Sequence, residues 1–144
     1  MKEYRVIRYK SPEYDEQVQL RYAVLRAPLG LRFTPEYLRK DEKDILFGCF
    51  LDGRLVGCGQ LSLLGGGVLQ LRQMAVAPDS QGQHVGKELV ACLEAYAKKE
   101  GGKKITLRAR LAAQGFYERL GYRAEGAQFL EVGIPHCTME KEII

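Results

Sequence analysis

The chain contains no tryptophan, only two histidines and only four cysteines among its 144 residues. The two histidines, His84 and His136, lie far apart, and no two cysteines have the C-x-x-C spacing of a zinc or redox site. These shortages exclude a metal centre of familiar spacing and a disulfide framework. We expect the cysteines, which stand among apolar neighbours, to be buried and reduced, as is typical of a cytoplasmic protein.

Long apolar runs and long basic runs are also absent. The longest uncharged run, residues 55–71, contains five glycines and alternates like strands, so it is not a membrane span. The first ten residues, MKEYRVIRYK, carry charges throughout, and we expect no signal peptide there. No run of Lys and Arg exceeds two residues and the net charge is +4, which argues against a nucleic-acid partner but suits an anionic ligand.

What the sequence does contain is a succession of clear helix and strand signals. Serine before proline at 11–12 and threonine before proline at 34–35 each predict the start of a helix. The first helix should extend to about Arg26. Its apolar stripe should consist of Val18, Tyr22 and Leu25.

Three strands joined by tight turns are predicted in the middle of the chain. Asp52-Gly53 is a strong hairpin signal between strands at 45–51 and 54–63, and three glycines then turn the chain into a strand at 68–77. Further strands are predicted at 4–9, 105–109, from 122 onward and at 136–144, and further helices from 85 to the glycines at 101–102 and at 111–120. We therefore expect one α/β (α+β) domain, residues 1–144, with a mixed, mostly antiparallel central sheet and helices on both faces.

The stretch DSQGQHVGKEL, residues 79–89, has the composition of an anion-binding loop. It precedes an amphipathic helix, whose first four amides lack partners within the helix and whose dipole adds about half a positive charge. Gly82 and Gly86 let an anion approach the backbone, and Lys87 adds a formal charge. The pattern predicts a phosphate or pyrophosphate ligand, although an ordinary loop and helix start would also fit. It matches neither G-x-x-x-x-G-K-[ST] nor G-x-G-x-x-G, which disfavours nucleotide hydrolysis and dinucleotide redox chemistry.

The segment LRQMAVAPDSQGQHVGKELVACLEAYAKKEG resembles the acetyl-CoA signature of the GNAT N-acyltransferase superfamily, whose core is Gln/Arg-x-x-Gly-x-Gly/Ala. A second segment, AAQGFYERLGY at 112–122, is similar to that family's Ala-x-x-Phe-Tyr-x-x-x-Gly-Phe pattern. The ending EVGIPHCTMEK resembles a bacterial branch whose last strand begins Gly-Ile-Pro-His. The resemblance covers residues 68–142 well, and the two landmark segments in this order are more specific than either alone.

The resemblance implies that acetyl-CoA is the co-substrate. Backbone groups of a splayed strand, Met74, Ala75 and Val76, would hydrogen-bond the pantetheine arm. The pyrophosphate would be held by the amides of Gln81, Gly82, Gln83, His84, Val85, Gly86 and Lys87. His84 departs from the family's usual glycine. Its imidazole could point outward, donate a hydrogen bond to phosphate, or crowd the site.

The resemblance also suggests two catalytic residues. Tyr117 aligns with the family's tyrosine that protonates the departing thiolate, although a core aromatic with a solvent-facing hydroxyl would look the same. His136 is the most attractive general base, because histidine changes charge nearest neutral pH, and its alternative role is to cap the last strand. Glu131, Glu125 and a water chain are weaker candidates for the base.

The acceptor is not specified by the sequence. The family implies a small-molecule or peptide amine, held by the variable segments 26–44 and 125–135, with Arg72 and Gln73 shaping its pocket. Arg110 stands where many relatives have asparagine, and could reach a phosphate or the acceptor. We expect an N-acetyltransferase, and the alternative is a protein that binds acetyl-CoA without turnover, as a sensor or regulator. Dimers are common among relatives, so a homodimer is expected.

Overall fold

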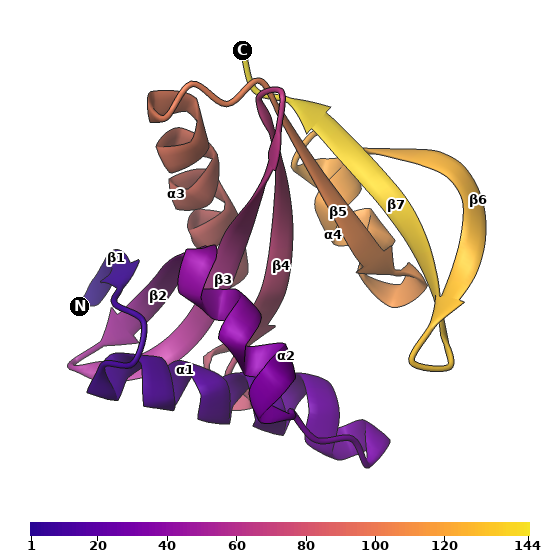
Figure 1. The fold of residues 1–144 in the computed structure, drawn as a ribbon. Helices are drawn as coiled ribbons and strands as arrows, with labels where there is room; N and C mark the ends of the chain where they lie inside the picture. The colour runs from indigo at the N-terminus through magenta and orange to yellow at the C-terminus, as the bar shows by residue number, and fades with distance from the viewer.

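The computed structural model describes residues 1–144 and contains one seven-stranded sheet (Figure 1). The strands are β1 (Lys2–Ile7), β2 (Ile45–Leu51), β3 (Arg54–Gly65), β4 (Val68–Val76), β5 (Lys104–Arg110), β6 (Arg123–Glu131) and β7 (Ile134–Glu142). Their order across the sheet is β1-β2-β3-β4-β5-β7-β6, and only the β4–β5 pair is parallel. The expected mixed, mostly antiparallel sheet is confirmed.

Four α-helices accompany the sheet. They are α1 (Pro12–Arg21), α2 (Pro35–Arg39), α3 (Val85–Lys99) and α4 (Gln114–Arg119). Both predicted caps are present, because Ser11 Oγ accepts from the Tyr14 amide at 3.2 Å and Thr34 Oγ1 accepts from the Tyr37 amide at 3.1 Å. After α1 the chain continues through a π-helical turn, Tyr22–Arg26, and a 3-10 turn. No helix has both the length and the apolar character needed to cross a membrane.

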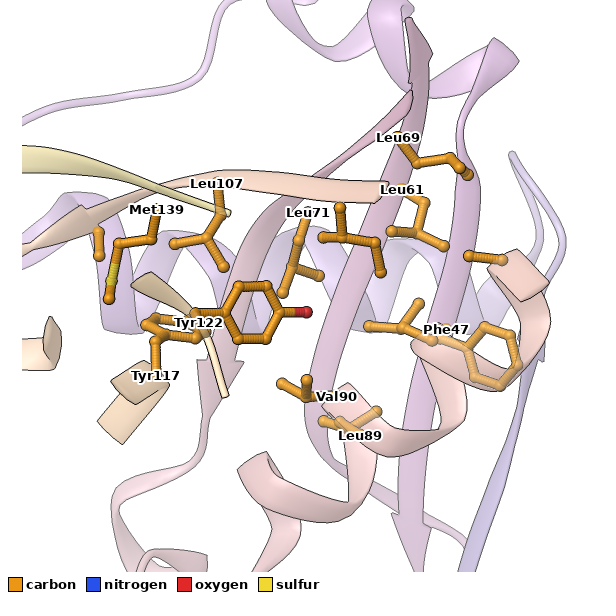
Figure 2. Close-up of a cluster of buried hydrophobic side chains, with 14 of the residues drawn as sticks. Phe47, Leu61, Leu69, Leu71, Leu89, Val90, Leu107, Tyr117, Tyr122 and Met139 are labelled. Atoms are coloured by element: carbon orange, nitrogen blue, oxygen red, sulfur yellow. The ribbon is translucent and has the colours of Figure 1, made fainter. Parts of the chain in front are cut away.

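The helices cover both faces of the sheet, as expected. Helix α3 packs Leu89 and Leu93, both fully buried, against the larger core cluster (Figure 2). Helix α1 lies on the other face, where Tyr14 packs in a smaller cluster with Phe50 and Leu46. Truncating a buried leucine of this kind to alanine costs about 2–5 kcal/mol, so Leu89 and Leu93 hold α3 firmly against the sheet.

The predicted apolar stripe of α1 is correct for Val18, which packs against the smaller core cluster, and wrong for Tyr22. Tyr22 remains 43% exposed, whereas the buried residues of α1 are Tyr14, Gln17 and Arg21. A charged residue is buried here because Asp41, on the turn after α2, supplies the opposite charge 2.7 Å away. That partner comes from a distant part of the sequence, so helical periodicity alone could not indicate it.

Strand β4 is the element that shapes the centre of the molecule. Its antiparallel pairing with β3 shifts between Cys58↔Ala75 and Gln60↔Arg72, so two β4 residues face the single residue Gly59. On its other side, β4 pairs with β5 only from Val68 to Leu71. Beyond that point the two strands diverge, as Figure 1 shows between β4 and β5. The divergence leaves one edge of the second half of β4 open.

Candidate functional site

The loop between β4 and α3 presents unpaired backbone donors. The Gln81 amide, which was also predicted to hold the pyrophosphate, donates to the Pro78 carbonyl oxygen at 3.5 Å. The next amide that bonds within the chain is that of Glu88, which donates to the His84 carbonyl oxygen at 2.9 Å. The amides of residues 82–87 donate no hydrogen bond to any backbone or side-chain acceptor, and α3 has no side-chain N-cap. Six free N–H groups at the positive end of a 15-residue helix are suited to an anion.

These amides open into a cavity of about 780 Å³. Most of its lining comes from β4, the loop, α3 and α4, and it contains every predicted cofactor-binding residue except Gln83: Met74, Ala75, Val76, Gln81, Gly82, His84, Val85, Gly86 and Lys87. The carbonyl oxygen of Gln83 instead accepts a hydrogen bond from Lys2 Nζ at 2.9 Å. Sequence reasoning missed Val24, Phe116 and Arg119, which also line this cavity.

Backbone conformation explains why the loop favours small residues. Gly82 has φ +83°, and no protein atom would lie within 4 Å of a Cβ added there. At Gly86 an added Cβ would lie 3.3 Å from the Phe116 ring, so glycine allows α3 and α4 to approach. His84 has φ 64°, a left-handed conformation that glycine adopts most easily. Its side chain is exposed and lies at the cavity wall.

The one acidic side chain in the first turn of α3 is held away from the loop. Lys2 Nζ lies 2.6 Å from Glu88 Oε1, and the Tyr4 hydroxyl donates to the same oxygen. The hydrogen bond from Lys2 is the main reason why the pKa of Glu88 is lowered. Because β1 neutralises this carboxylate, it opposes an anion at the helix start less than a free glutamate would.

A second cavity, of about 870 Å³, lies on the other side of the β4–β5 divergence. It is bounded by the segment after α1, by α2 and the turn after it, and by the ends of β5 and β7, so the predicted acceptor segments do form its walls. The two cavities share three lining residues: Met74, Ala113 and Tyr117. The two cavities therefore meet at this junction.

Tyr117 is the one phenol at the junction. Its side chain packs edge-on against Phe116 and Tyr122, and only 8% of the residue is exposed. Burial alone raises the pKa of Tyr117 to about 12, because no hydrogen bond or charge contributes. The hydroxyl is therefore protonated near neutral pH and retains its proton for donation.

His136 lies on the opposite wall of the second cavity, at the start of β7. It is 4% exposed, and its ring stacks on Phe129. Nδ1 lies 2.7 Å from the Ile134 carbonyl oxygen, which can only accept, so Nδ1 carries the proton and the neutral ring keeps a lone pair on Nε2. Glu131 Oε2 lies 3.8 Å from that Nε2. The other carboxylate considered, Glu125, pairs with Arg123 on exposed β6 and does not line the cavity.

Arg72 and Gln73 line the second cavity as predicted, but their partner was not anticipated. The Tyr37 hydroxyl accepts from Gln73 Nε2 at 2.7 Å and from Arg72 Nη2 at 3.3 Å. Arg72 also forms an ion pair with Asp44 at 3.0 Å. Tyr37, Lys40 and Asp44 follow no recognisable motif, and only the fold brings them beside β4.

Arg110 belongs to the second cavity and not to the first. Its Nη2 donates to the carbonyl oxygen of Leu25 at 3.2 Å, so the guanidinium extends toward the segment after α1. The sequence left open whether Arg110 reaches a phosphate or the acceptor. This geometry favours the acceptor, because Arg110 lines the second cavity only.

The comparisons with known proteins agree on one family. A family model described as an acetyltransferase (GNAT) domain matches residues 29–143. A Bacillus subtilis protein, YyaT, named as uncharacterized, is 34% identical over 88 residues, which cover 61% of this chain but only 59% of that protein. Another Bacillus subtilis protein, named as an acetyltransferase, is 29% identical over 130 residues, 86% of each chain. The crystal structure of an aminoglycoside 6'-N-acetyltransferase complexed with coenzyme A has a TM-score of 0.82 at 19% identity, covering 99% of this chain and 97% of that one.

Proposed function

Because this chain belongs to the GNAT acetyltransferase family, we propose that it transfers the acetyl group of acetyl-CoA to the nitrogen of an amine. The observation that carries the proposal is the meeting of two cavities at Tyr117. One contains the free amides at the start of α3, and the other is lined by His136. A diphosphate in the first and an amine in the second would place the thioester between Met74 and Tyr117.

The residues of the first cavity fit coenzyme A. Free amides 82–87 and Lys87 provide donors and positive charge for the diphosphate. The open edge of β4, from Met74 to Val76, provides backbone groups that no longer pair with β5 and can bond the amides of the pantetheine arm. When bound, acetyl-CoA supplies an activated acyl carbon, and no covalent enzyme intermediate is needed.

In the transfer, the amine nitrogen attacks the thioester carbonyl carbon, a C–N bond forms, and the C–S bond breaks. A protonated amine loses two protons overall: one ends on the coenzyme A sulfur and the other leaves to solvent. We assign delivery of the first to the Tyr117 hydroxyl, which is protonated and lies at the junction: it gives its own proton to the sulfur and recovers one from the amine nitrogen. We assign removal of the other to Nε2 of His136, which has a free lone pair in the neutral ring.

The surroundings of Tyr117 suit an acid, and those of His136 suit a base. Tyr117 keeps its proton until a basic thiolate forms nearby, because burial disfavours its ionised form. The imidazolium formed at His136 is stabilised by the Glu131 carboxylate 3.8 Å from Nε2. Most of the rate gain would still come from holding amine and thioester in contact, as in any direct displacement between two bound substrates.

The proposal is tested by titration calorimetry with acetyl-CoA, followed by measurement of thiol release with a panel of amines. We expect binding that is lost when pantetheine replaces coenzyme A, and release of thiol with at least one amine. Tyr117→Phe should lower kcat about a hundredfold, because a general acid contributes about 10²–10⁴-fold, and should leave acetyl-CoA affinity unchanged. Tyr96→Phe is the control, because Tyr96 is partly buried, packs on Phe47 and lines neither cavity.

Two results would contradict the proposal in different ways. If acetyl-CoA did not bind, the loop before α3 could no longer be assigned as the diphosphate site. Binding without turnover of any amine, and without an effect of Tyr117→Phe, would point to a protein that senses acetyl-CoA. The junction of the two cavities favours turnover, since a sensor has no need for a second cavity that opens at the thioester.

A further inference from the structure

The walls of the second cavity carry an excess of positive charge. Five of its lining residues are cationic: Arg26, Lys40, Arg72, Arg108 and Arg110. Only two are acidic, Asp44 and Glu131. The whole chain has a net charge of only +4, so this cavity holds a large share of the excess. Low-dielectric walls of one sign concentrate the field inside a cleft, and here that field attracts anions.

The two acids are already engaged, whereas three of the cations are not. Asp44 pairs with Arg72 at 3.0 Å, and Glu131 pairs with Arg108 at 3.1 Å. Arg26, Lys40 and Arg110 form no ion pair with any carboxylate; Arg110 bonds only the Leu25 carbonyl oxygen, with its Nη2. These three side chains therefore keep unbalanced charge at the cavity wall.

Packing gathers the unpaired charges on one side of the cavity. The Tyr37 ring has Arg26 Cζ 5.1 Å and Lys40 Nζ 5.5 Å from its centroid. Arg110 reaches the residue next to Arg26 in the chain, Leu25. Three cations thus border one region of the second cavity. They come from the segment after α1, the turn after α2 and the end of β5. The aromatic face holds two of them in place without neutralising them.

The coenzyme does not account for this charge. Its diphosphate would lie at the start of α3 in the first cavity, where the free amides, Lys87 and Arg119 are available. None of the three unpaired cations lines that cavity. The charge must therefore act on whatever occupies the second cavity, which on the proposed function is the acetyl acceptor.

We propose that the acceptor is a small amine that carries at least one carboxylate, and that Arg26, Lys40 and Arg110 bind this carboxylate. The inference rests on the proposed function. A cavity of about 870 Å³ is within the range of small-molecule sites. Guanidinium groups bind carboxylates through two parallel hydrogen bonds, which would orient the amine end toward Tyr117 and His136. Polycations such as polyamines and aminoglycosides would be repelled.

The substrate test uses matched pairs of amines. γ-Aminobutyrate and β-alanine are compared with their carboxamides, which carry no carboxylate, and with spermidine and kanamycin as cationic amines. We expect kcat/KM to be about tenfold or more higher for the carboxylate member of at least one pair, since a charged hydrogen-bond partner is replaced by a neutral one. The preference should shrink as salt is added, because part of it is electrostatic.

The residue test uses Arg26→Gln and Lys40→Gln, with Arg32→Gln and Lys43→Gln as controls. The control residues are exposed cations on the same segments and do not line the cavity. The first two changes should raise KM for the carboxylate amine about tenfold, with little change in kcat or in acetyl-CoA affinity, as for loss of uniform binding. Arg26→Lys should restore most of the preference, and Arg26→Glu should shift it toward the neutral or cationic member.

Because Arg26 packs on Tyr37 and on Phe33, a melting curve of each variant separates loss of binding from loss of structure. Binding is also measured without turnover: glutarate, but not glutaramide, should raise the melting temperature of the protein saturated with coenzyme A. Acetylation of spermidine or kanamycin in preference to every carboxylate amine would overturn this inference and leave the transferase proposal intact. An effect of Arg26→Gln on acetyl-CoA affinity alone would also overturn it. Absence of turnover with every amine would instead defeat the transferase proposal.

Discussion

Arg21 Nη1 and Asp41 Oδ2 lie 2.7 Å apart, and both side chains are completely buried. Asp41 also accepts hydrogen bonds from the Tyr14 hydroxyl at 2.7 Å and from Gln60 Nε2 at 2.9 Å. Gln60 in turn donates to Asp44, the partner of Arg72 in the wall of the second cavity. One buried network therefore connects α1 to the wall of the second cavity.

Replacement of Asp41 by asparagine should be strongly destabilising. The variant leaves Arg21 buried without an opposite charge, and breaking such a pair costs about 3–5 kcal/mol. Arg21 already has two nitrogen atoms, Nε and Nη2, without hydrogen-bond partners, so it has no alternative acceptor nearby. Urea unfolding measures the change, and Glu42→Gln, an exposed neighbour, is the control. Equal midpoints for the two variants would show that the pair contributes nothing.

Lys87→Gln should weaken acetyl-CoA binding by about 1 kcal/mol, a several-fold rise in Kd, since an exposed charge contributes no more than that. Lys87 lines the first cavity within the first turn of α3, beside the free amides. The loss should be largest at low ionic strength. Lys99→Gln, at the other end of the same helix, is the matched control for titration calorimetry. A similar Kd in the two variants would mean that the amides hold the diphosphate without help from Lys87.

The local features of this fold could be predicted from the sequence because their causes are local. The Asp52-Gly53 turn has positive φ at both residues, and the strand that precedes it was placed correctly at Ile45–Leu51. The loop of free amides before α3 could also be predicted, because its glycines, its lysine and the helix start are all properties of one short segment. Element ends were less accurate: β1 spans Lys2–Ile7, whereas 4–9 was predicted.

The second cavity could not be predicted, because its walls depend on contacts between distant segments. Tyr37 reaches Gln73 and Arg72 of β4 from α2, and Arg110 at the end of β5 reaches Leu25 in the segment after α1. Nothing in the composition of residues 26–44 indicates which of their cations will face inward. A contact between distant segments also explains the error in the apolar stripe predicted for α1. Arg21 is buried there because it pairs with Asp41, which apolar periodicity does not indicate.

His136→Gln should lower kcat at neutral pH, and the kcat of the variant should recover at alkaline pH. In the proposed mechanism, Nε2 of His136 accepts the proton that a charged amine must lose. Glutamine has no such base, so the variant depends on the fraction of amine that is already neutral. That fraction grows as pH approaches the amine's own pKa, about 8 for an α-amino group and about 10 for a lysine-like amine. The ratio of native to variant kcat, measured across this range, should fall steadily. A constant ratio would assign His136 a structural role only.

Tyr117→Phe should change how stability depends on alkaline pH. Burial raises the pKa of Tyr117 from its usual value of 10.0 to about 12, so the unfolded chain releases this proton first. The native protein then loses stability as pH rises from about 10 through about 12, and the contribution amounts to about 1.4 kcal/mol at pH 11. The variant lacks this contribution and should lose less stability over the same interval in urea unfolding. Parallel curves for the two proteins would show that the phenol is not desolvated.

Gly59→Ala tests whether the junction depends on the position of Met74. A Cβ added at Gly59 would lie 2.5 Å from Met74 Sδ and 2.9 Å from Leu93 Cδ1, so both side chains must move. Met74 lines both cavities, and its displacement should lower kcat/KM. Overpacking of this kind also destabilises by about 1–3 kcal/mol, so a control of equal strain is needed.

Gly48→Ala provides that control. An added Cβ there would lie 2.7 Å from Ile7 Cδ1 and from Leu55 Cδ1, both in the core cluster on the α1 face of the sheet. The two variants should therefore lose similar stability, measured by urea unfolding, while only Gly59→Ala loses activity per folded molecule. Equal activities would mean that Met74 adjusts without disturbing the thioester. A loss of activity in both would mean that the site responds to general strain in the sheet, and the junction would then not depend specifically on Met74.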